Sequence, residues 1–481
     1  MKSLALVVLA ACVPAAQEAK PPAWVSDTRP YVPRTGSVLA DRYRDVAAKI
    51  LAAAHADRGA YDKLEQLTDR IGHRLAGSPE LERAIPLLVG MMQTDGLDAH
   101  SEKVMVPHWV RGPEDAALVT PIARPIVLIG LGGTVATPKA GITAPVVVVH
   151  DWKELDAKRD AIAGSIVLYN TPMPAYSDEK GAGYGETVGY RTAGPSRAAK
   201  YGAVATLVRS VTARALRLPH TGALDYDNKL PKIPAAAVTI EDADLIDRLA
   251  AAGPVSVHLH LESQQLPDAE SANVIGELRG RDKPDEIVVI GGHIDSWDVG
   301  QGAHDDGAGI VTMMEAAALL KRLGLVPRRT IRVVGFTNEE NGTRGAKAYA
   351  AEHQGELART VLALESDSGG FAPRGFVVGE HDAEGAKRLH ARFSDLVQLL
   401  DPIGATRVVD GGHAGADIDP MAPAGVPQIG LLVDGRTYFD IHHTEADTLD
   451  KVDPAQLADD VAAAAILAYI AADAPDRLDA P

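Results

Sequence analysis

The segment EIVVIGGHIDSWDVGQGAHDDGAG, residues 286–309, decides the fold that this sequence predicts. Its first seven residues form a nearly continuous apolar run, which is typical of a strand covered by helices on both faces. The remainder is polar and rich in glycine, and it places His293, Asp295 and Asp305 after the strand. The segment therefore predicts an α/β sheet with ionisable residues at the carboxyl end of one strand.

The chain after this segment alternates between predicted strands and predicted helices. The apolar runs TIRVVGFT (330–337) and TVLALESD (360–367) have the length and composition of strands. Helical patterns cover residues 342–353, 383–399 and 454–472. This alternation predicts a three-layer α/β sandwich with a mixed, largely parallel sheet.

A region with a different sequence pattern interrupts this alternation of strands and helices. Between residues 114 and 261, short β-branched runs such as PIVLIGL and PVVVVH are separated by glycine and proline. A chain of 481 residues is also too long for one ordinary core. We therefore expect a β-rich domain at 114–261, inserted between two parts of one larger domain, 21–113 and 262–481.

The first 20 residues have the features of a signal peptide. An apolar run follows Lys2, and it is too short to span a membrane as a stable helix. The segment LAAC (9–12) resembles a bacterial lipobox, in which Cys12 becomes lipidated, but a cut near Ala15 or Ala16 by an ordinary signal peptidase is an open alternative. We expect an exported protein, periplasmic or secreted, either free or lipid-anchored. No other segment is expected to reach transmembrane length.

Cysteine content and charge restrict the remaining chemistry. Cys12 is the only cysteine, so the mature fold has no internal disulfide and no thiolate ligand. The chain has 48 basic and 65 acidic residues, and its net charge of −17 argues against nucleic acid or an anionic membrane as a main partner.

Ionisable residues follow three separate predicted strands. His293 follows the first strand, Glu339 and Glu340 follow the second, and Asp367 follows the third. Because ligands gather at the carboxyl ends of strands in open α/β sheets, we expect these side chains to converge. Asp295 is expected to accept a hydrogen bond from the second ring nitrogen of His293 and so to fix its tautomer.

This set of residue types fits a pair of divalent cations. Imidazole and carboxylate groups are ligands of zinc, and a carboxylate-rich set with few histidines suits two adjacent ions. Asp305 and Asp306 are neighbours, so only one should face the site, where it could bridge ions about 3.5–4 Å apart. A glutamate beside a metal-binding glutamate would supply a general base for hydrolysis.

Four motifs together resemble the zinc exopeptidases of metallopeptidase family 28. They are GHIDSWDVGQGAHDDGAG, the glutamate pair of TNEEN, ESDSG (365–369) and HHTEADT (442–448). LTDRIGHRLAGSPELERA and VMVPHWVRG match the early part of that family, and GADI (415–418) resembles its carboxypeptidase Q group. The resemblance implies a zinc-peptidase fold with an inserted protease-associated (PA) domain, and it allows a homodimer.

The resemblance also implies roles for individual residues. His293 and Asp367 would hold one of two Zn²⁺ ions, Glu340 and His443 would hold the other, and Asp305 would bridge them. Glu339 would be the base that takes a proton from the bridging water and returns it to the leaving amine. His442 is an alternative to His443 as the last ligand. His413, Asp417, Asp440 and Trp297 are candidates for lining the substrate pocket.

The function expected from these residues is hydrolysis of dipeptides or short peptides by an exopeptidase. A carboxypeptidase or dipeptidase and an aminopeptidase both stay open. A non-catalytic receptor-like relative should have lost ligands or the base, whereas all five ligand positions and Glu339 hold competent residues here. The sequence has neither the G-x-S-x-G motif of serine hydrolases nor HExxH.

Overall fold

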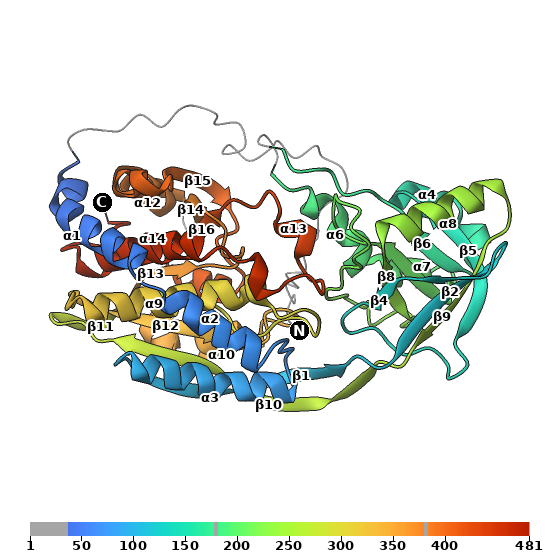
Figure 1. Ribbon diagram of the computed structural model, residues 1–481, viewed down its shortest axis with the longest axis horizontal. Helices are drawn as coiled ribbons and strands as arrows, with labels where there is room; N and C mark the ends of the chain where they lie inside the picture. Colours follow the sequence, from blue (N-terminus) through green and yellow to red (C-terminus); the bar gives the residue numbers. More distant parts are fainter. Residues whose placement is uncertain (1–36, 178–180, 380–382, 481) are drawn as a thin grey trace, which may run out of the picture.

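The computed structural model describes residues 37–177, 181–379 and 383–480. The expected signal peptide at 1–20 and the lipid anchor at Cys12 lie outside these residues. Within the described chain the strands form two eight-stranded sheets, which occupy opposite ends of the elongated molecule in Figure 1.

The first sheet is mixed, as the sequence predicts. Its parallel centre consists of β12, β11, β13 and β16, while the pairings β1–β10, β10–β12 and β14–β16 are antiparallel. In spatial order its strands are β1 (Asp98–Val110), β10 (Gln264–Leu278), β12 (Arg329–Phe336), β11 (Lys283–His293), β13 (Thr360–Glu365), β16 (Gln428–Val433), β14 (Pro373–Gly379) and β15 (Arg407–Gly412).

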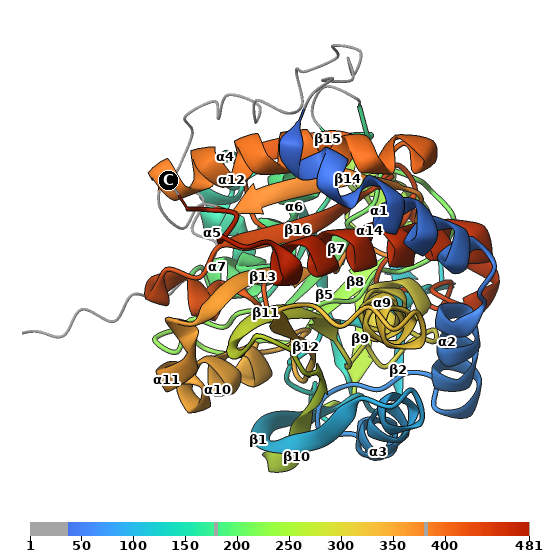
Figure 2. The same cartoon turned by 90° about the vertical axis from the view of Figure 1, so that its left-hand side faces the viewer.

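Helices cover both faces of this sheet and complete the three layers (Figure 2). Strand β11 explains why, since Val288 and Ile290 belong to the core on one face while Ile287 and Val289 belong to the core on the other. The first face carries α1 (Val38–His55), α2 (Gly59–Arg70), α3 (Pro79–Thr94), α9 (Gly309–Arg322), α12 (Ala383–Leu396) and α14 (Pro454–Asp473), and the second carries α10 (Arg344–Glu352) and α11 (Gln354–Leu357).

One expectation about membrane-spanning length was wrong. Helix α14 is long and apolar enough to cross a membrane by length and composition, but 72% of its apolar window is buried within the protein. It packs against α9 and α1, so its apolar residues form part of the core.

The second sheet is built from the residues between Glu114 and Leu261, where the sequence predicts an inserted domain. Its strands in spatial order are β3 (Arg124–Ile126), β2 (Glu114–Thr120), β9 (Ser256–Leu261), β5 (Ile142–Val149), β6 (Ile166–Tyr169), β7 (Ala205–Arg209), β8 (Ala235–Val238) and β4 (Leu128–Gly130). The long strands β1 and β10 run together toward this sheet (Figure 1), and Val110 pairs with Gln264. The chain therefore leaves the first sheet and returns to it at adjacent positions.

The sequence was less informative about the second region. Besides its strands, this region contains the helices α4 (Trp152–Ala157), α5 (Arg159–Ile162), α6 (Tyr184–Thr192), α7 (Gly194–Ala199) and α8 (Ile240–Ala252). The run PIVLIGL, expected as one strand, is divided between β3 and β4, which pair with different partners. Helix α6 lies beside α13 (Tyr438–Ile441), between the two sheets (Figure 1).

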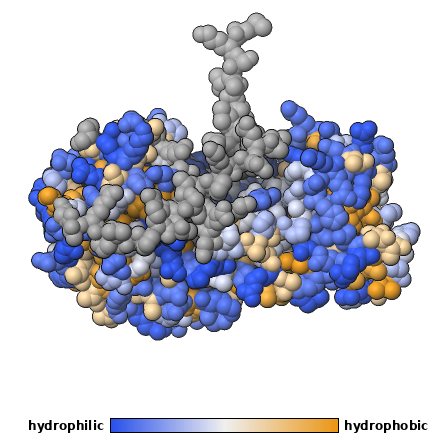
Figure 3. All heavy atoms as spheres, turned by 90° about the horizontal axis from the view of Figure 1, so that it is seen from above, coloured by the Kyte–Doolittle hydropathy of each residue, from blue (hydrophilic) through white to orange (hydrophobic). Residues whose placement is uncertain are grey.

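Hydrophilic residues dominate the face seen in Figure 3, with hydrophobic residues scattered among them. Exposed large hydrophobic side chains come from separate elements, such as Met105 on β1 and Ile122 after β2. Charged residues make up 23% of the chain, which is close to the average for globular domains.

Candidate metal centre

Three neighbouring parallel strands deliver ionisable residues to one edge of the first sheet. His293 is the last residue of β11, Glu339 and Glu340 follow β12, and Asp367 follows β13. His293 stands in register with Phe336 of β12. Side chains that are far apart in the sequence therefore meet beyond the carboxyl ends of the strands.

Asp305 lies at the centre of this cluster, between the two imidazoles. Its Oδ1 atom is 3.3 Å from His293 Nε2, which is also 3.3 Å from Asp367 Oδ1. Its Oδ2 atom is 3.1 Å from His443 Nε2, which is 3.2 Å from Glu340 Oε2. The two oxygens of one carboxylate thus face two separate pairs of ligand groups, as a bridging ligand between two ions requires.

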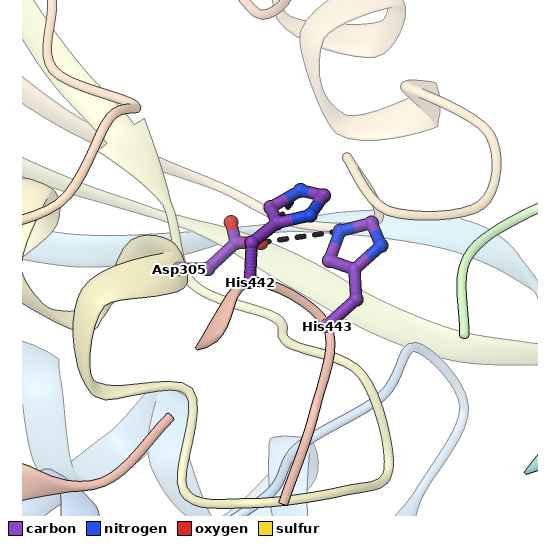
Figure 4. Close-up of side chains that lie close together, drawn as sticks. All are labelled: Asp305, His442 and His443. Atoms are coloured by element: carbon purple, nitrogen blue, oxygen red, sulfur yellow. Dashed lines mark ion pairs between the residues drawn. The ribbon is translucent and has the colours of Figure 1, made fainter. Parts of the chain in front are cut away.

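The neighbouring histidine, His442, makes a different set of contacts. Its ring stacks on that of His443 with centroids 3.5 Å apart, and Figure 4 shows both rings beside Asp305. His442 Nε2 is 3.5 Å from Asp305 Oδ2, and its ring packs against Tyr438 and Phe439. Because His443 faces two carboxylates and His442 faces one, the geometry favours His443 as the ligand.

Asp295 orients the site in a way the sequence did not predict. We expected its carboxylate to accept a hydrogen bond from His293, but Nδ1 donates instead to the main-chain carbonyl of Asp295, at 2.9 Å. The carboxylate lies 3.8 Å from that nitrogen and accepts hydrogen bonds from the backbone N–H groups of Glu339 and Glu340, at 3.0 and 3.4 Å. Asp295 therefore fixes the turn that presents both glutamates.

Asp306 faces away from the ligands. Its Oδ2 atom accepts a hydrogen bond from the backbone N–H of His293 at 3.1 Å. A Cβ atom on Gly292 or Gly309 would lie 2.3 or 2.1 Å from the oxygens of Asp306, so both positions require glycine. Of the adjacent aspartates, only Asp305 has a carboxylate within 3.3 Å of the two imidazoles.

Two further residues hold the backbone of the site, and sequence reasoning did not assign them. The buried guanidinium of Arg74 donates to the carbonyls of Ile294, Gln301 and Gly302 at 2.7–2.8 Å. Asp447 accepts hydrogen bonds from the N–H groups of His304 and Asp305 at 2.7 and 3.1 Å. Both lie in motifs quoted above, but their targets are backbone atoms, which a sequence does not mark.

The electrostatics of the cluster match a site for cations. Burial raises the pKa of Glu340 to about 7, and burial together with Asp367 and Glu340 raises the pKa of Glu339 well above its usual range. Against burial, His293 and His443 hold the pKa of Asp305 well below its usual value. Asp305 Oδ2 is buried and accepts no hydrogen bond, although His443 is near. Such a concentration of buried carboxylates is stabilised by divalent cations.

A pocket of about 460 Å³ opens beside the cluster. Both regions of the chain form its wall. Its described lining includes Asp305, Glu339, Glu340, Asp367 and His443, with Tyr176, Tyr184, Arg191 and Ala223 from the second region and Leu432, Val433, Tyr438 and Phe439 from the first.

The four residues expected to line this pocket are absent from its described wall. Trp297 packs in a buried cluster with Leu75 and Trp109, while Asp417 is buried. His413 pairs with Asp419 at 2.7 Å, and Asp440 pairs with Arg214 at 3.0 Å. Ion pairs hold His413 and Asp440, and apolar packing holds Trp297.

Comparison with known proteins identifies the family. The sequence profile of Peptidase family M28 matches residues 273–469. Carboxypeptidase Q of Homo sapiens is 40% identical over 439 residues, which cover 90% of this chain and 90% of that protein. The chain belongs to peptidase family M28. The family resemblance seen in the motifs is therefore confirmed.

Solved structures agree with this assignment. A peptidase M28 precursor from Shewanella amazonensis has a TM-score of 0.86 at 37% identity, covering 91% of this chain and 98% of that chain. A zinc aminopeptidase from Bacillus subtilis has a TM-score of 0.63 at 21% identity, covering 88% and 96%. This second likeness shows that the two proteins share a fold.

Proposed function

We propose that this protein is a di-zinc exopeptidase that hydrolyses dipeptides or short peptides in the manner of a carboxypeptidase Q. The observation that carries this proposal is the position of Asp305, whose two oxygens face the imidazoles of His293 and His443. His293 and Asp367 would hold one Zn²⁺, Glu340 and His443 the other, and Asp305 would join them. Oxygen and imidazole donors fit zinc.

Glu339 is the general base in this proposal. When bound, the two ions supply Lewis acidity that activates water and polarises a peptide carbonyl. Glu339 lines the pocket, takes the proton of the attacking water and returns it to the leaving amine. Asp295 is a positioning residue, because its carboxylate holds the backbone of both glutamates.

We also propose that residues 114–261 form an inserted, PA-like domain whose ends meet at the β1–β10 ladder. The protein is exported, with residues 1–20 as its signal peptide, and it forms a homodimer. An aminopeptidase is the second candidate, since aminopeptidases share the fold. The complete set of ligands and base disfavours a non-catalytic receptor-like role.

Metal analysis combined with a panel of blocked substrates tests the proposal. The purified protein should contain two zinc ions per chain and cleave short peptides, and removal of zinc by a chelator should abolish cleavage reversibly. Blocking the carboxyl end of a dipeptide should prevent cleavage by a carboxypeptidase, whereas blocking the amino end should prevent cleavage by an aminopeptidase. A metal-free protein that cleaves these peptides would contradict the proposal.

A further inference from the structure

A buried arginine of the second region lines the pocket. Arg191 lies near the end of α6 and is 6% exposed. Among the described residues of the pocket wall it is the only one with a permanent positive charge. A buried guanidinium without a carboxylate partner is costly, so this one requires an explanation.

The contacts of Arg191 leave donors free. Nη1 donates to the Thr221 carbonyl at 3.3 Å and Nη2 to the Tyr184 hydroxyl at 2.8 Å, and both acceptors are neutral. Nε is buried and has no hydrogen-bond partner. In the described part of the chain no carboxylate pairs with this side chain. Of its five N–H groups, those not used by these neighbours can bind an anion.

The position of Arg191 is built into the fold. Gly222 has a φ of +134°, and a Cβ atom there would lie 2.4 Å from Arg191 Cζ. The glycine therefore makes room for the guanidinium. Tyr184, which holds Nη2, stacks on Phe439 of α13 with ring centroids 4.6 Å apart, so the arginine is anchored across the boundary of the two regions.

One carbonyl oxygen links Arg191 to the metal centre. The Thr221 oxygen lies 3.3 Å from Arg191 Nη1 and 3.3 Å from His443 Nδ1. The guanidinium is thus adjacent to a proposed metal-ligating imidazole. In a dipeptide, three bonds separate the scissile carbonyl carbon from the terminal carboxylate carbon, a span of at most roughly 3.8 Å. The carboxylate of such a substrate therefore stays close to the scissile bond, and Arg191 lines the same pocket as the metal cluster.

We infer that Arg191 binds the free α-carboxylate of the residue on the leaving side of the scissile bond. Guanidinium binds carboxylate in a bidentate, charge-assisted geometry, which a carboxamide cannot reproduce. This inference rests on the proposed function and deepens it, because it makes the enzyme specific for dipeptides and other substrates with a free carboxyl end at that position. The acidic residues of the described pocket wall all belong to the metal cluster, so the wall offers no separate anion for a substrate ammonium.

The test compares one dipeptide, Leu-Ala, with its carboxyl-terminal amide, using the zinc-loaded full chain. Wild type should prefer the free dipeptide by about 100-fold in kcat/KM, the size expected for a charge-assisted hydrogen-bonded pair. Arg191→Met should lower kcat/KM for the free dipeptide by about the same factor, mainly by raising KM. The kcat/KM for the amide should change by less than about threefold. Arg248→Met, an exposed arginine on α8 of the same region, is the matched control and should behave like wild type.

Equal loss on both substrates, or a wild type that cleaves the amide as fast as the free dipeptide, would overturn the inference. If Arg191→Met does not fold, Arg191→Lys should fold and show a reduced preference for the free dipeptide. Lysine keeps the positive charge but lacks the planar guanidinium that binds a carboxylate through two hydrogen bonds. A protein without peptidase activity can still be tested by calorimetry with alanine and alaninamide, the leaving-side residue of Leu-Ala and its amide. Alanine, but not alaninamide, should bind wild type, and the affinity for alanine should be lost in Arg191→Met. Equal binding of both compounds to wild type would contradict the inference.

Discussion

The two imidazoles of the proposed metal centre are positioned by different parts of the chain. His293 ends strand β11, and its Nδ1 atom binds a carbonyl only two residues later. His443 lies beyond α13 with a left-handed φ of +60°, and its Nδ1 atom faces the Thr221 carbonyl, 222 residues away in the second region. The half of the site around His293, here called the first half, is held within the first region. The half around His443, here called the second half, depends on contact between the two regions.

This difference assigns a role to the second region. Its helix α6 and the segment around Thr221 contribute a pocket wall, an orienting carbonyl and the guanidinium of Arg191. Hydrogen bonds to the far nitrogen of a metal-binding histidine fix its tautomer and orientation. The second region should therefore affect substrate binding through Arg191 and the orientation of His443 through Thr221, whereas the first region supplies the proposed ligands and base.

The largest effect is expected from Glu339→Gln, which alters the base that serves both halves. The amide cannot accept a proton from water, so kcat should fall by about 10³-fold, within the range of general-base contributions. Zinc content should stay at two ions per chain, because Glu339 is not among the proposed ligands. Kinetics and metal analysis on the same preparation check this, and activity close to wild type would remove the assigned role.

Asp295→Asn changes the support of the turn that carries Glu339 and Glu340, and it replaces no proposed ligand side chain. One amide group replaces an oxygen that accepts from Glu339 or Glu340, so the turn loosens. We expect kcat to fall about 10–100-fold, as for other supporting residues of metal sites. The preference between Leu-Ala and its amide should not change. A shift in that preference would show that the first half also controls carboxylate recognition.

Gly222→Ala changes the second half. The added methyl group would displace the Arg191 guanidinium, so KM for Leu-Ala should rise about tenfold, close to the loss of one charged hydrogen bond. Gly133→Ala is the control, because its φ of +83° is also positive but its Cβ would meet nothing within 4 Å. An equal rise of KM in the control would attribute the effect to strain alone.

The smallest effect on activity is expected from Asp460→Asn, at a buried carboxyl of α14 outside both halves. Neither oxygen has a hydrogen-bond partner, and burial raises its pKa well above the usual range. The folded state therefore keeps a proton that the unfolded state releases above about pH 4, so stability is lost as pH rises. The asparagine variant should gain roughly 1–3 kcal/mol at pH 8 and nothing below pH 4, measured by denaturant unfolding. A gain that is independent of pH would contradict this reason.

The proposed ligands and base could be predicted from sequence, whereas the contributions of the second region to the site could not. Strands β11, β12 and β13 are marked by apolar runs, and the residues after them must meet at one sheet edge. Thr221 acts through a backbone carbonyl, which leaves no trace in its residue type. Arg191 sits in a short helix with a mixed pattern, and its burial depends on Gly222 and Tyr184, which only the tertiary structure brings to it. The partner of the Asp295 carboxylate was predicted wrongly for a related reason. The backbone of the turn places the N–H groups of Glu339 and Glu340 beside it.

Anomalous X-ray scattering at the zinc edge, from crystals of the zinc-loaded protein, would locate the proposed ions. We expect two peaks about 3.5–4 Å apart, one beside His293 and Asp367 and the other beside Glu340 and His443, with Asp305 between them. A single peak, or ions bound away from Asp305, would contradict it.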